Sequence, residues 1–407
     1  MIKILISNYG TKVQERQNWL RIFFLVFTSL LILVASFALF YFQARQWIAS
    51  DYFGHLELYN LFKQNDWIIY PPLYYWTYDL LDEILWYKYD YILSTLLILS
   101  FSILAKYLLT WRYVLHSSSK YGRWTYLLPL VLLLFSPIYL FSYEGKYLYM
   151  GKFTSSIWHN CTSTFVWPFC ILLFFFTLKW IRTRDRLHYQ ALWIIGVLIC
   201  LAKPSFLFAF IPVLPVVLIV HRSPFKILMQ GVFLCIGLLL LIYGAKVIIY
   251  DYGTLDSLII PLFPDAKKNK VVFDLLGVWL HFVEYPILDI VSSFAFLIFA
   301  LAVYGKALFR TLDFQFSFLL LLVSLLVFFL FAESGYRFAD ANFYWQIPIS
   351  LYILYVVIVK NLLEARVFQP STTAEKIKLG ILSLLFLAHF FSGVHFIYVY
   401  LTTGIYL

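Results

Sequence analysis

The amino-acid sequence predicts an all-α, polytopic transmembrane protein, and three observations lead to this fold class. Hydrophobic residues make up 63% of the 407 positions and charged residues only 13%. The apolar residues fall in blocks of roughly twenty, the length that a helix needs to cross a bilayer. Aromatic residues, 21% of the chain, often lie near the ends of these blocks, where amphipathic rings favour the lipid headgroups. A soluble multidomain protein is excluded.

The apolar blocks predict about eleven membrane-spanning helices, with boundaries good to a few residues. The first block follows several lysines and arginines, and its apolar run from about Leu20 to Phe42 is too long for the core of a signal peptide. We therefore expect it to be retained as a helix. The expected spans are 20–43, 90–111, 124–143, 164–181, 190–202, 205–220, 226–250, 285–305, 314–332, 342–360 and 379–403.

Two neighbouring spans differ from the others. The first, 190–202, is short for a hydrocarbon core of ~30 Å. Lys203-Pro204 then interrupts the apolar pattern, as proline does within a helix. The segment 190–220 is therefore either two spans or a re-entrant pair, and both alternatives return the chain to the same side.

The charge distribution predicts the sidedness of the loops. The formal net charge of +10 could indicate nucleic-acid binding, but the basic residues are dispersed and form no recognisable motif, so no nucleic-acid partner is expected. With the N-terminus in the cytoplasm, the inner connections carry most of the bases, and the outer connections hold more acids than bases. The long, chemically rich loops then face outward.

One integral membrane domain is expected over 1–407, because the sequence has no internal repeat and no flexible linker. Short helices are expected in the first outer loop, 44–89. The four cysteines lack the spacing of a metal site, so no metal and no other cofactor are predicted. The Walker A, GxGxxG, GxSxG and HExxH motifs are absent, which leaves soluble nucleotide binding and several hydrolase mechanisms without support.

The first outer loop carries the leading catalytic candidate, because the spacing puts Asp51 and His55 on one helical face. A carboxylate at the membrane surface can accept a proton from an acceptor hydroxyl, especially if burial raises its pKa. The alternative is that Asp51 only caps the N-terminus of a helix. His55, Glu57 and Tyr70 from the same loop are candidates for substrate binding.

Two further outer segments contain substrate-binding candidates. His159 and Asn160 follow a tryptophan, and such a cluster either binds and stacks on a sugar or only anchors a helix at the interface. Lys203 lies near membrane depth, where a lysine either extends to the interface or neutralises an anionic lipid group. Both pairs of alternatives remain open from the sequence.

The outer loop before the tenth span contributes the last candidates. Arg337 suits a phosphate because its charge is permanent and its donors are planar and forked, although it could instead pair with Glu333 or Asp340. Asn342 and Gln346 are expected one turn apart on the same face of an apolar helix, where buried amides need partners. We therefore include Glu333, Arg337, Asn342 and Gln346 among the substrate-binding candidates.

The order of these features resembles the GT-C superfamily of polytopic glycosyltransferases. The residues that carry the resemblance are Asp51, Gly54, His55 and the run from Tyr70 to Tyr75, and specific similarity covers residues 20 to about 110. The resemblance implies a polyprenyl-phosphate sugar as donor and an acidic residue of the first outer loop, here Asp51, as catalytic base. The chain departs from larger members because it has one acid-x-x-x-His element instead of a pair of acids, so metal dependence is not predicted.

The resulting expectation is an inverting glycosyltransferase in a bacterial plasma membrane, with its active site on the extracytoplasmic face. Asp51 would deprotonate a hydroxyl of a cell-envelope glycan or lipid acceptor, while Arg337 and Lys203 stabilise the departing lipid phosphate. A transporter or flippase of lipid-linked glycans is the first alternative and should show broken helices in corresponding halves. A membrane acyltransferase is the second, and it would need a buried histidine such as His389 or His395.

Overall fold

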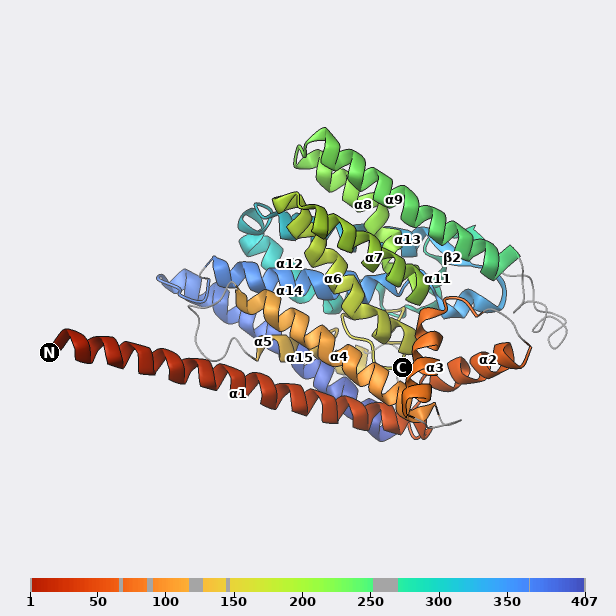
Figure 1. The fold of residues 1–407 in the computed structure, drawn as a ribbon, viewed down its shortest axis with the longest axis horizontal. Helices are drawn as coiled ribbons and strands as arrows, with labels where there is room; N and C mark the ends of the chain where they lie inside the picture. Colours follow the sequence, from red (N-terminus) through yellow and green to blue (C-terminus); the bar gives the residue numbers. More distant parts are fainter. Residues whose placement is uncertain are drawn as a thin grey trace.

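The computed structural model describes residues 2–65, 69–85, 91–116, 127–143, 147–251, 270–365 and 367–405. Helices dominate, and most of them run side by side along one direction (Figure 1). The α-helices are α1 (Ile2–Ala44), α2 (Tyr52–Gln64), α3 (Leu73–Leu85), α4 (Ile92–His116), α5 (Leu128–Leu133), α6 (Cys161–Thr183), α7 (Arg186–Ala202), α8 (Leu207–Val220), α9 (Phe225–Lys246), α11 (Gly277–Phe282), α12 (Pro286–Leu308), α13 (Leu312–Leu330), α14 (Gln346–Glu364) and α15 (Thr373–Thr403).

Short elements join the helices at the ends of the bundle. The 3-10 turns are η2 (Phe141–Tyr143), η3 (Pro204–Phe206) and η5 (Gly335–Asp340), and a π-helical turn, η4 (Val247–Asp251), extends α9. The strands β1 (Val271–Phe273) and β2 (Phe331–Glu333) pair antiparallel. We call the end where α1 stops and α6 and α14 begin the site end, and the end where α13 begins and α14 stops the opposite end.

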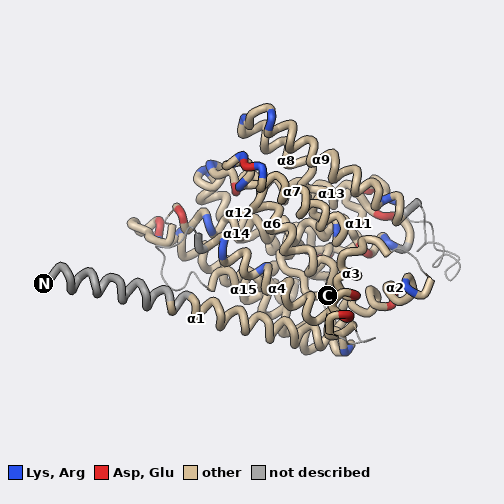
Figure 2. The backbone as a smooth tube through the Cα atoms, viewed as in Figure 1, with Lys and Arg blue, Asp and Glu red and all other residues tan. Residues whose placement is uncertain are grey.

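The prediction of a polytopic helical membrane protein is confirmed at the level of its long apolar helices. Among the described residues, eight helices are long and apolar enough to cross a membrane, and each overlaps one of the predicted spans. Charged residues lie mainly toward the two ends of the bundle (Figure 2). The predicted starts of the second and third spans, residues 90 and 124, lie outside the described residues. Sidedness stays a prediction.

One of the eleven predicted spans is wrong as a helix. Within 127–143 the α-helix α5 covers only Leu128–Leu133, and residues 135–140 form no regular secondary structure. Pro137 has no backbone N–H to donate, and the N–H groups of its neighbours donate to α12 and α15 and not to a helical turn. These bonds are Ser136 N–His389 O (3.3 Å), Ile138 N–Ser292 O (3.0 Å) and Tyr139 N–Ser392 Oγ (2.9 Å). This non-helical backbone is tolerated because protein, not lipid, surrounds it.

The doubtful segment 190–220 contains two short apolar helices, α7 and α8, joined at Lys203. The start of α7 follows the last turn of α6, whereas the Lys203 ammonium contacts Asn160 at the first turn of α6. After α8, His221 bonds Gln315 at the start of α13, with Nε2 2.8 Å from Oε1. The helices α7 and α8 therefore run from the opposite end of the bundle to the site end and back.

The core of the bundle is built around α14, in which every residue from Gln346 to Val359 is buried. Helices α4, α6, α8, α12 and α13 all pack against it. By contrast, α9 exposes large apolar side chains such as Phe233 (65%) and Leu240 (66%) along its outer face. A helix that is apolar on every side suits a position between protein and lipid.

The packing of α15 against the end of α5 predicts the effect of a glycine substitution. A Cβ atom on Gly393 would clash with the carbonyl oxygen of Leu134, whereas one on Gly380 in the same helix meets nothing within 4 Å. We expect Gly393→Ala to lower the free energy of unfolding by about 1–3 kcal/mol, because backbone has to move. Gly380→Ala should be neutral or stabilise by about 1 kcal/mol through helix propensity. Thermal unfolding in detergent, compared for the two variants, measures this, and equal effects would contradict the close approach.

Candidate functional site

A buried loop, residues 147–160, prepares the site. Every residue from Gly151 to His159 is buried, so the polar groups of its backbone need partners within the protein. These partners are side chains of distant elements, and the bonds are Trp279 Nε1–Gly151 O (2.9 Å), Tyr344 Oη–Lys152 O (2.9 Å), Phe153 N–Ser293 Oγ (3.0 Å) and Gln43 Nε2–Trp158 O (2.7 Å). The loop is thereby fixed, and it delivers His159 and Asn160 to the first turn of α6.

Asp51 lies between the end of α1 and the start of α2, against the same turn of α6. Its backbone N–H donates to the carbonyl oxygen of His159 (3.1 Å), and its Oδ1 accepts from the backbone N–H of Cys161 (2.9 Å). Its Oδ2 is 3.2 Å from Nε2 of His55, which confirms the predicted one-turn spacing. The other ring nitrogen of His55 is 2.6 Å from the hydroxyl of Tyr75.

The sequence suggested two roles for Asp51, a catalytic base and a cap at the N-terminus of the helix that follows it, and this geometry bears on the second. Its side chain makes no capping hydrogen bond to α2, the helix that follows it. Instead it accepts from the first turn of α6, together with Asn160, whose Oδ1 accepts from Ser163 N (2.9 Å). An anionic side chain at a helix N-terminus is stabilised by the unpaired N–H groups and by the helix dipole.

The protonation states follow from these contacts. Burial alone would raise the pKa of Asp51, but the nearby His55 and the hydrogen bonds from His55 and Cys161 outweigh it and lower the pKa to about 2. The suggestion that burial raises this pKa toward neutrality is therefore wrong. Burial lowers the pKa of His159 to about 4, so this imidazole is neutral at physiological pH although Asp51 is close.

Lys203 adds a positive charge to the same turn of α6. Its ammonium donates to Asn160 Oδ1 (2.9 Å) and Thr162 Oγ1 (3.1 Å), and it lies 5.1 Å from the ring centroid of Trp345. Burial lowers the pKa of Lys203 to about 8, although Asp51 and Asp340 act in the other direction. Groups of the protein thus hold the Lys203 ammonium, and Lys203 is uncharged in a fraction of the molecules near physiological pH.

The candidates from the outer loop before the tenth predicted span form a neighbouring cluster. Arg337 Nε lies 3.6 Å from Glu333 Oε1 and 3.5 Å from Asp340 Oδ2, so its ion pairs are those that the sequence offered as the alternative to a phosphate. Asn342 donates to the Glu333 carboxylate. Trp345 links the two clusters, because its Nε1 donates to Asp340 O (3.1 Å) and its ring is close to both Lys203 and His159.

The remaining candidates lie apart from this group. Glu57 is on an exposed face of α2, and the Tyr70 hydroxyl contacts Cys200 O at 3.4 Å. Gln346 is buried between α13 and α14, where its Nε2 donates to Ser324 O (3.2 Å). The expectation that Asn342 and Gln346 share a helical face is wrong, because α14 begins only at Gln346 and Asn342 lies in the turn before it.

Sequence reasoning missed three groups that complete the site. They are the Tyr75 hydroxyl on His55, the Trp345 ring between the clusters, and the backbone N–H of Cys161 on Asp51. Tyr75 belongs to the run from Tyr70 to Tyr75 that carries the resemblance, whereas no local signal marks the other two groups, because they act on residues of distant segments. In the described part of the chain, no three His, Cys, Asp or Glu side chains gather as metal ligands, and the absence of a metal remains a prediction.

The lowered pKa of Asp51 predicts how stability depends on pH. Because the carboxyl binds its proton less tightly when folded, it stabilises the protein above its ordinary pKa of 3.8, and this contribution is lost as the pH falls toward 2. Between pH 5 and 8, we expect the free energy of unfolding of the wild type to be about 2 kcal/mol larger than that of Asp51→Asn. This difference should disappear as the pH falls below about 4. Thermal unfolding in detergent at each pH measures the difference.

The matched control for this experiment is Glu57→Gln, which removes the same charge from the exposed face of α2. It should leave stability nearly unchanged at every pH. A difference between wild type and Asp51→Asn that stays constant from pH 5 to 2 would mean that the charge of Asp51 does not contribute.

Known proteins provide no further guide to this site. Comparisons of the chain with protein-family models, with curated proteins and with solved structures found no match. The resemblance in the first outer loop and the geometry around the first turn of α6 are therefore the basis on which a function can be argued.

Proposed function

We propose that the protein is a membrane glycosyltransferase that moves a sugar from a polyprenyl-phosphate donor to a hydroxyl of a cell-envelope glycan or lipid. The observation that carries the proposal is the grouping of Asp51, His55 and Lys203 around the first turn of α6. It combines an ionised carboxylate, an oriented imidazole and a cation at one end of a bundle of apolar helices. By the positive-inside asymmetry, this end faces out of the cytoplasm.

In the proposed reaction, the acceptor hydroxyl attacks the anomeric carbon of the donor sugar. A new carbon–oxygen bond forms, the bond to the lipid phosphate breaks with inversion, and the hydroxyl proton passes to Asp51. With a pKa of about 2, Asp51 is a weak base, so it takes the proton only as the new bond is nearly complete. Its hydrogen bonds to Cys161 and His55 hold the carboxylate in one orientation toward the acceptor.

The leaving lipid phosphate carries negative charge that the site has to stabilise. Lys203 is the first candidate, since its bonds to Asn160 and Thr162 fix its position near Asp51. Arg337 is the second, and it would exchange contacts with Glu333 or Asp340, at 3.6 and 3.5 Å, for contacts with the phosphate.

A transporter of lipid-linked glycans is the second candidate, because one observation favours it. Besides the break at Lys203-Pro204, the irregular segment 135–140 is a second interruption of a predicted span, and interrupted helices are a feature of many transporters. The acyltransferase alternative gains no support, since both ring nitrogens of the buried His389 bond backbone groups, Ser136 O at 2.6 Å and Phe296 N at 3.3 Å.

The first test is sugar transfer by purified wild type and Asp51→Asn. With a panel of polyprenyl-phosphate sugars, we expect the wild type to release free polyprenyl phosphate. Asp51→Asn should bind the same donor but react about 10²–10⁴-fold more slowly, because the general base is lost. Donor binding and phosphate release, measured on the same preparations, separate the two effects.

The control variant is Glu83→Gln, which removes an exposed carboxylate of α3 from the same predicted loop and should react like the wild type. If Asp51→Asn also reacts like the wild type, Asp51 is not the base. If the wild type binds no lipid-linked sugar, the proposed function is wrong; binding and translocation in vesicles without release of polyprenyl phosphate would support the transporter.

The pKa of Lys203 predicts the pH dependence of the transfer. Its charge is present below about pH 8 and lost above it, so kcat/KM for the donor should fall as the pH rises through 8. Lys203→Arg keeps its charge and should remove this fall, whereas Lys203→Met should be slower at every pH below 8. Measurements of kcat/KM for the donor from pH 6 to 10 test this prediction. Identical pH profiles for the wild type and Lys203→Arg would exclude Lys203 as the titrating group.

A further inference from the structure

The carboxylate and the imidazole of the candidate site continue into a third side chain. Nε2 of His55 is 3.2 Å from Oδ2 of Asp51, and Nδ1 of the same ring is 2.6 Å from the hydroxyl of Tyr75. Tyr75 is 3% exposed, and among the described residues His55 is the hydrogen-bond partner of its hydroxyl. The three groups come from the connection after α1, from α2 and from α3, so both helices of the first predicted loop meet at the imidazole.

Contacts between α2 and α3 fix the position of the Tyr75 hydroxyl. The ring of Tyr59 stacks on that of Tyr75, with centroids 5.7 Å apart and planes 3° apart. One turn further along both helices, the Tyr59 hydroxyl donates to the carboxylate of Asp79, which lies 3.2 Å from the Lys63 ammonium. The contributing residues of each helix are four positions apart, so one face of α2 and one face of α3 supply all these contacts.

The partners of the imidazole determine which of its nitrogens carries a proton. Although burial opposes it, contacts with His55 and Cys161 lower the pKa of Asp51 to about 2, so its carboxylate is ionised and can only accept. Nε2 of His55, which faces it, therefore carries a proton whether the ring is neutral or charged.

The second nitrogen of the neutral ring has the lone pair. Burial raises the pKa of Tyr75, so its hydroxyl keeps its proton and donates it to Nδ1 of His55. The other neutral tautomer would point the lone pair of Nε2 at the Asp51 carboxylate. It would also leave the buried Tyr75 proton without an acceptor in the described part of the chain, and both changes are unfavourable.

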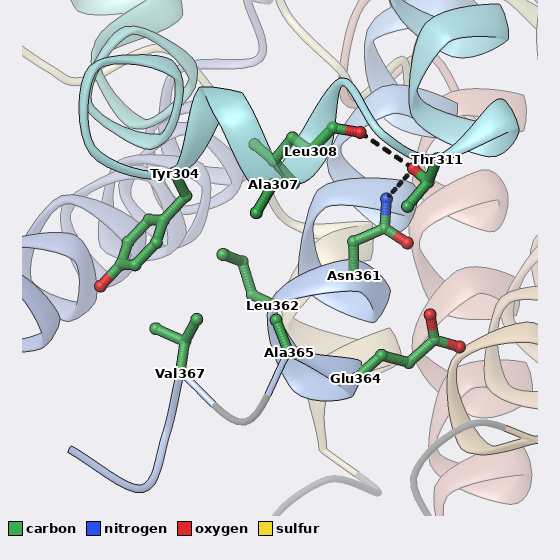
Figure 3. A pocket seen from close by; sticks show the side chains of 9 residues that line it. All are labelled: Tyr304, Ala307, Leu308, Thr311, Asn361, Leu362, Glu364, Ala365 and Val367. Carbon is green, nitrogen blue, oxygen red and sulfur yellow. Dashed lines mark hydrogen bonds between the residues drawn. The ribbon is translucent and has the colours of Figure 1, made fainter. Parts of the chain in front are cut away.

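The opposite end of the bundle provides a comparison, because a buried carboxylate there also has a tyrosine partner. The cavity at that end has a volume of about 130 Å³, and its lining includes Thr311, Asn361 and Glu364 (Figure 3). Asp313, at the start of α13, is not part of this lining and is only 1% exposed. Its carboxylate is therefore closed to a ligand in the cavity.

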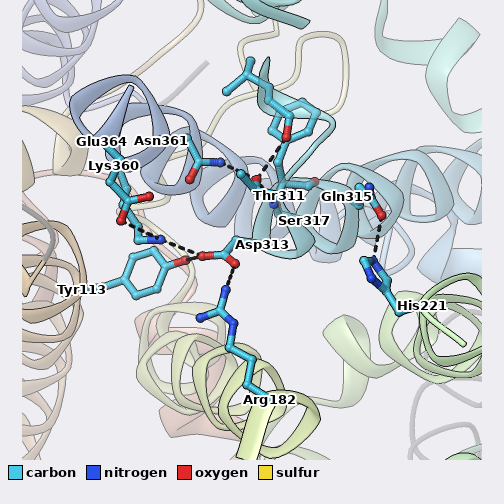
Figure 4. Close-up of polar contacts among 12 residues, drawn as sticks. Tyr113, Arg182, His221, Thr311, Asp313, Gln315, Ser317, Lys360, Asn361 and Glu364 are labelled. Atoms are coloured by element: carbon cyan, nitrogen blue, oxygen red, sulfur yellow. Dashed lines mark hydrogen bonds and ion pairs between the residues drawn. The ribbon is translucent and has the colours of Figure 1, made fainter. Parts of the chain in front are cut away.

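The partners of Asp313 differ from those of Asp51 in charge. Asp313 accepts from Tyr113 (2.5 Å), from Lys360 (2.8 Å) and from Arg182, so a hydroxyl and two cations surround it (Figure 4). Asp51 accepts from a backbone N–H and from the imidazole, and 27% of its side chain stays exposed. The contacts of Asp313 bind helices together, whereas those of Asp51 orient a carboxylate that an acceptor can still reach.

We propose that Tyr75 is a positioning residue of the sugar transfer, which turns the Nε2–H of His55 toward Asp51 through its bond to Nδ1. The imidazole then orients the carboxylate as a hydrogen-bond donor. It does not relay the proton, because the nitrogen that faces Asp51 already carries one. The proton of the acceptor hydroxyl passes to Asp51 and leaves from there to water. This inference rests on the proposed function.

The first test compares His55→Gln with His55→Leu in sugar transfer. The amide nitrogen of glutamine can donate from roughly the place of Nε2 but cannot take up a proton, whereas leucine can do neither. We expect kcat of His55→Gln to exceed that of His55→Leu by about 10–100-fold, the effect of one hydrogen bond to a charged acceptor. Equal losses in the two variants would mean that His55 relays the proton and would overturn the proposal.

The second test removes single hydroxyl groups. Tyr75→Phe should lower kcat by about 2–10-fold, the effect of one hydrogen bond between uncharged groups. The matched control is Tyr91→Phe, which removes a hydroxyl that contacts the exposed Lys63 at 3.4 Å, and its kcat should equal that of the wild type. Losses of the same size in both variants would overturn the specific role of Tyr75.

Nitrogen NMR of protein with isotope-labelled histidine tests the assignment without sugar transfer. The signals of His55 are identified by their absence from His55→Gln. At about pH 8, where an ordinary histidine is uncharged, we expect the proton on Nε2 and the lone pair on Nδ1, and Tyr75→Phe should shift the Nδ1 signal. A proton on Nδ1 in the wild type, or an Nδ1 signal that Tyr75→Phe leaves in place, would overturn the proposal.

The two readouts separate the failure of this inference from that of the proposed function. An inactive wild type with the expected nitrogen signals would refute the sugar transfer and support the orientation of His55 by Tyr75. The tautomer of the wild type needs no change at Tyr75, so the proposal stays falsifiable if Tyr75→Phe fails to fold.

Discussion

The polar backbone of the buried loop 147–160 is the constraint on which the rest of this structure depends. Inside an apolar bundle, each unpaired peptide group costs several kcal/mol, so the loop exists only because other elements supply partners. Gln43 of α1, Trp279 of α11 and Ser293 of α12 do so, with Tyr344 from the turn before α14. These contacts hold the helices and the loop together, and they fix the point at which α6 begins.

The first turn of α6 then determines the electrostatics of the candidate site. Burial disfavours the charged forms of both Asp51 and Lys203, yet the two groups respond differently. Asp51 accepts hydrogen bonds from a backbone N–H and from His55, and these lower its pKa despite burial. For Lys203, the attraction of Asp51 and Asp340 offsets burial only in part, so its pKa falls to about 8. The result is a carboxylate that is ionised at physiological pH beside a positive charge that is lost near pH 8.

The span predicted at 124–143, which is not a continuous helix in the structure, illustrates what hydropathy measures. The apolar residues there indicate removal from water, but they do not distinguish a helix in lipid from an irregular segment inside protein. The backbone of residues 135–140 is covered by α12 and α15, and His389 closes a hydrogen bond with Ser136 O. The long helices were predictable because their length and composition leave a single solution in a bilayer, in which every peptide group bonds within its own helix.

The sequence by itself determined the all-α class, the positions of the long apolar helices, the presence of short helices in the first predicted loop and the neighbouring positions of Asp51 and His55. These features depend on local spacing, which helical geometry converts directly into structure. Only the tertiary structure decided that Asp51 binds the first turn of α6, that Lys203 reaches Asn160, and that Asn342 and Gln346 separate. The physical reason is that Cys161 and Asn160, which bind Asp51 and Lys203, lie far away from them in the chain, and that Asn342 and Gln346 bond different neighbours, Glu333 and Ser324. No local spacing contains that information.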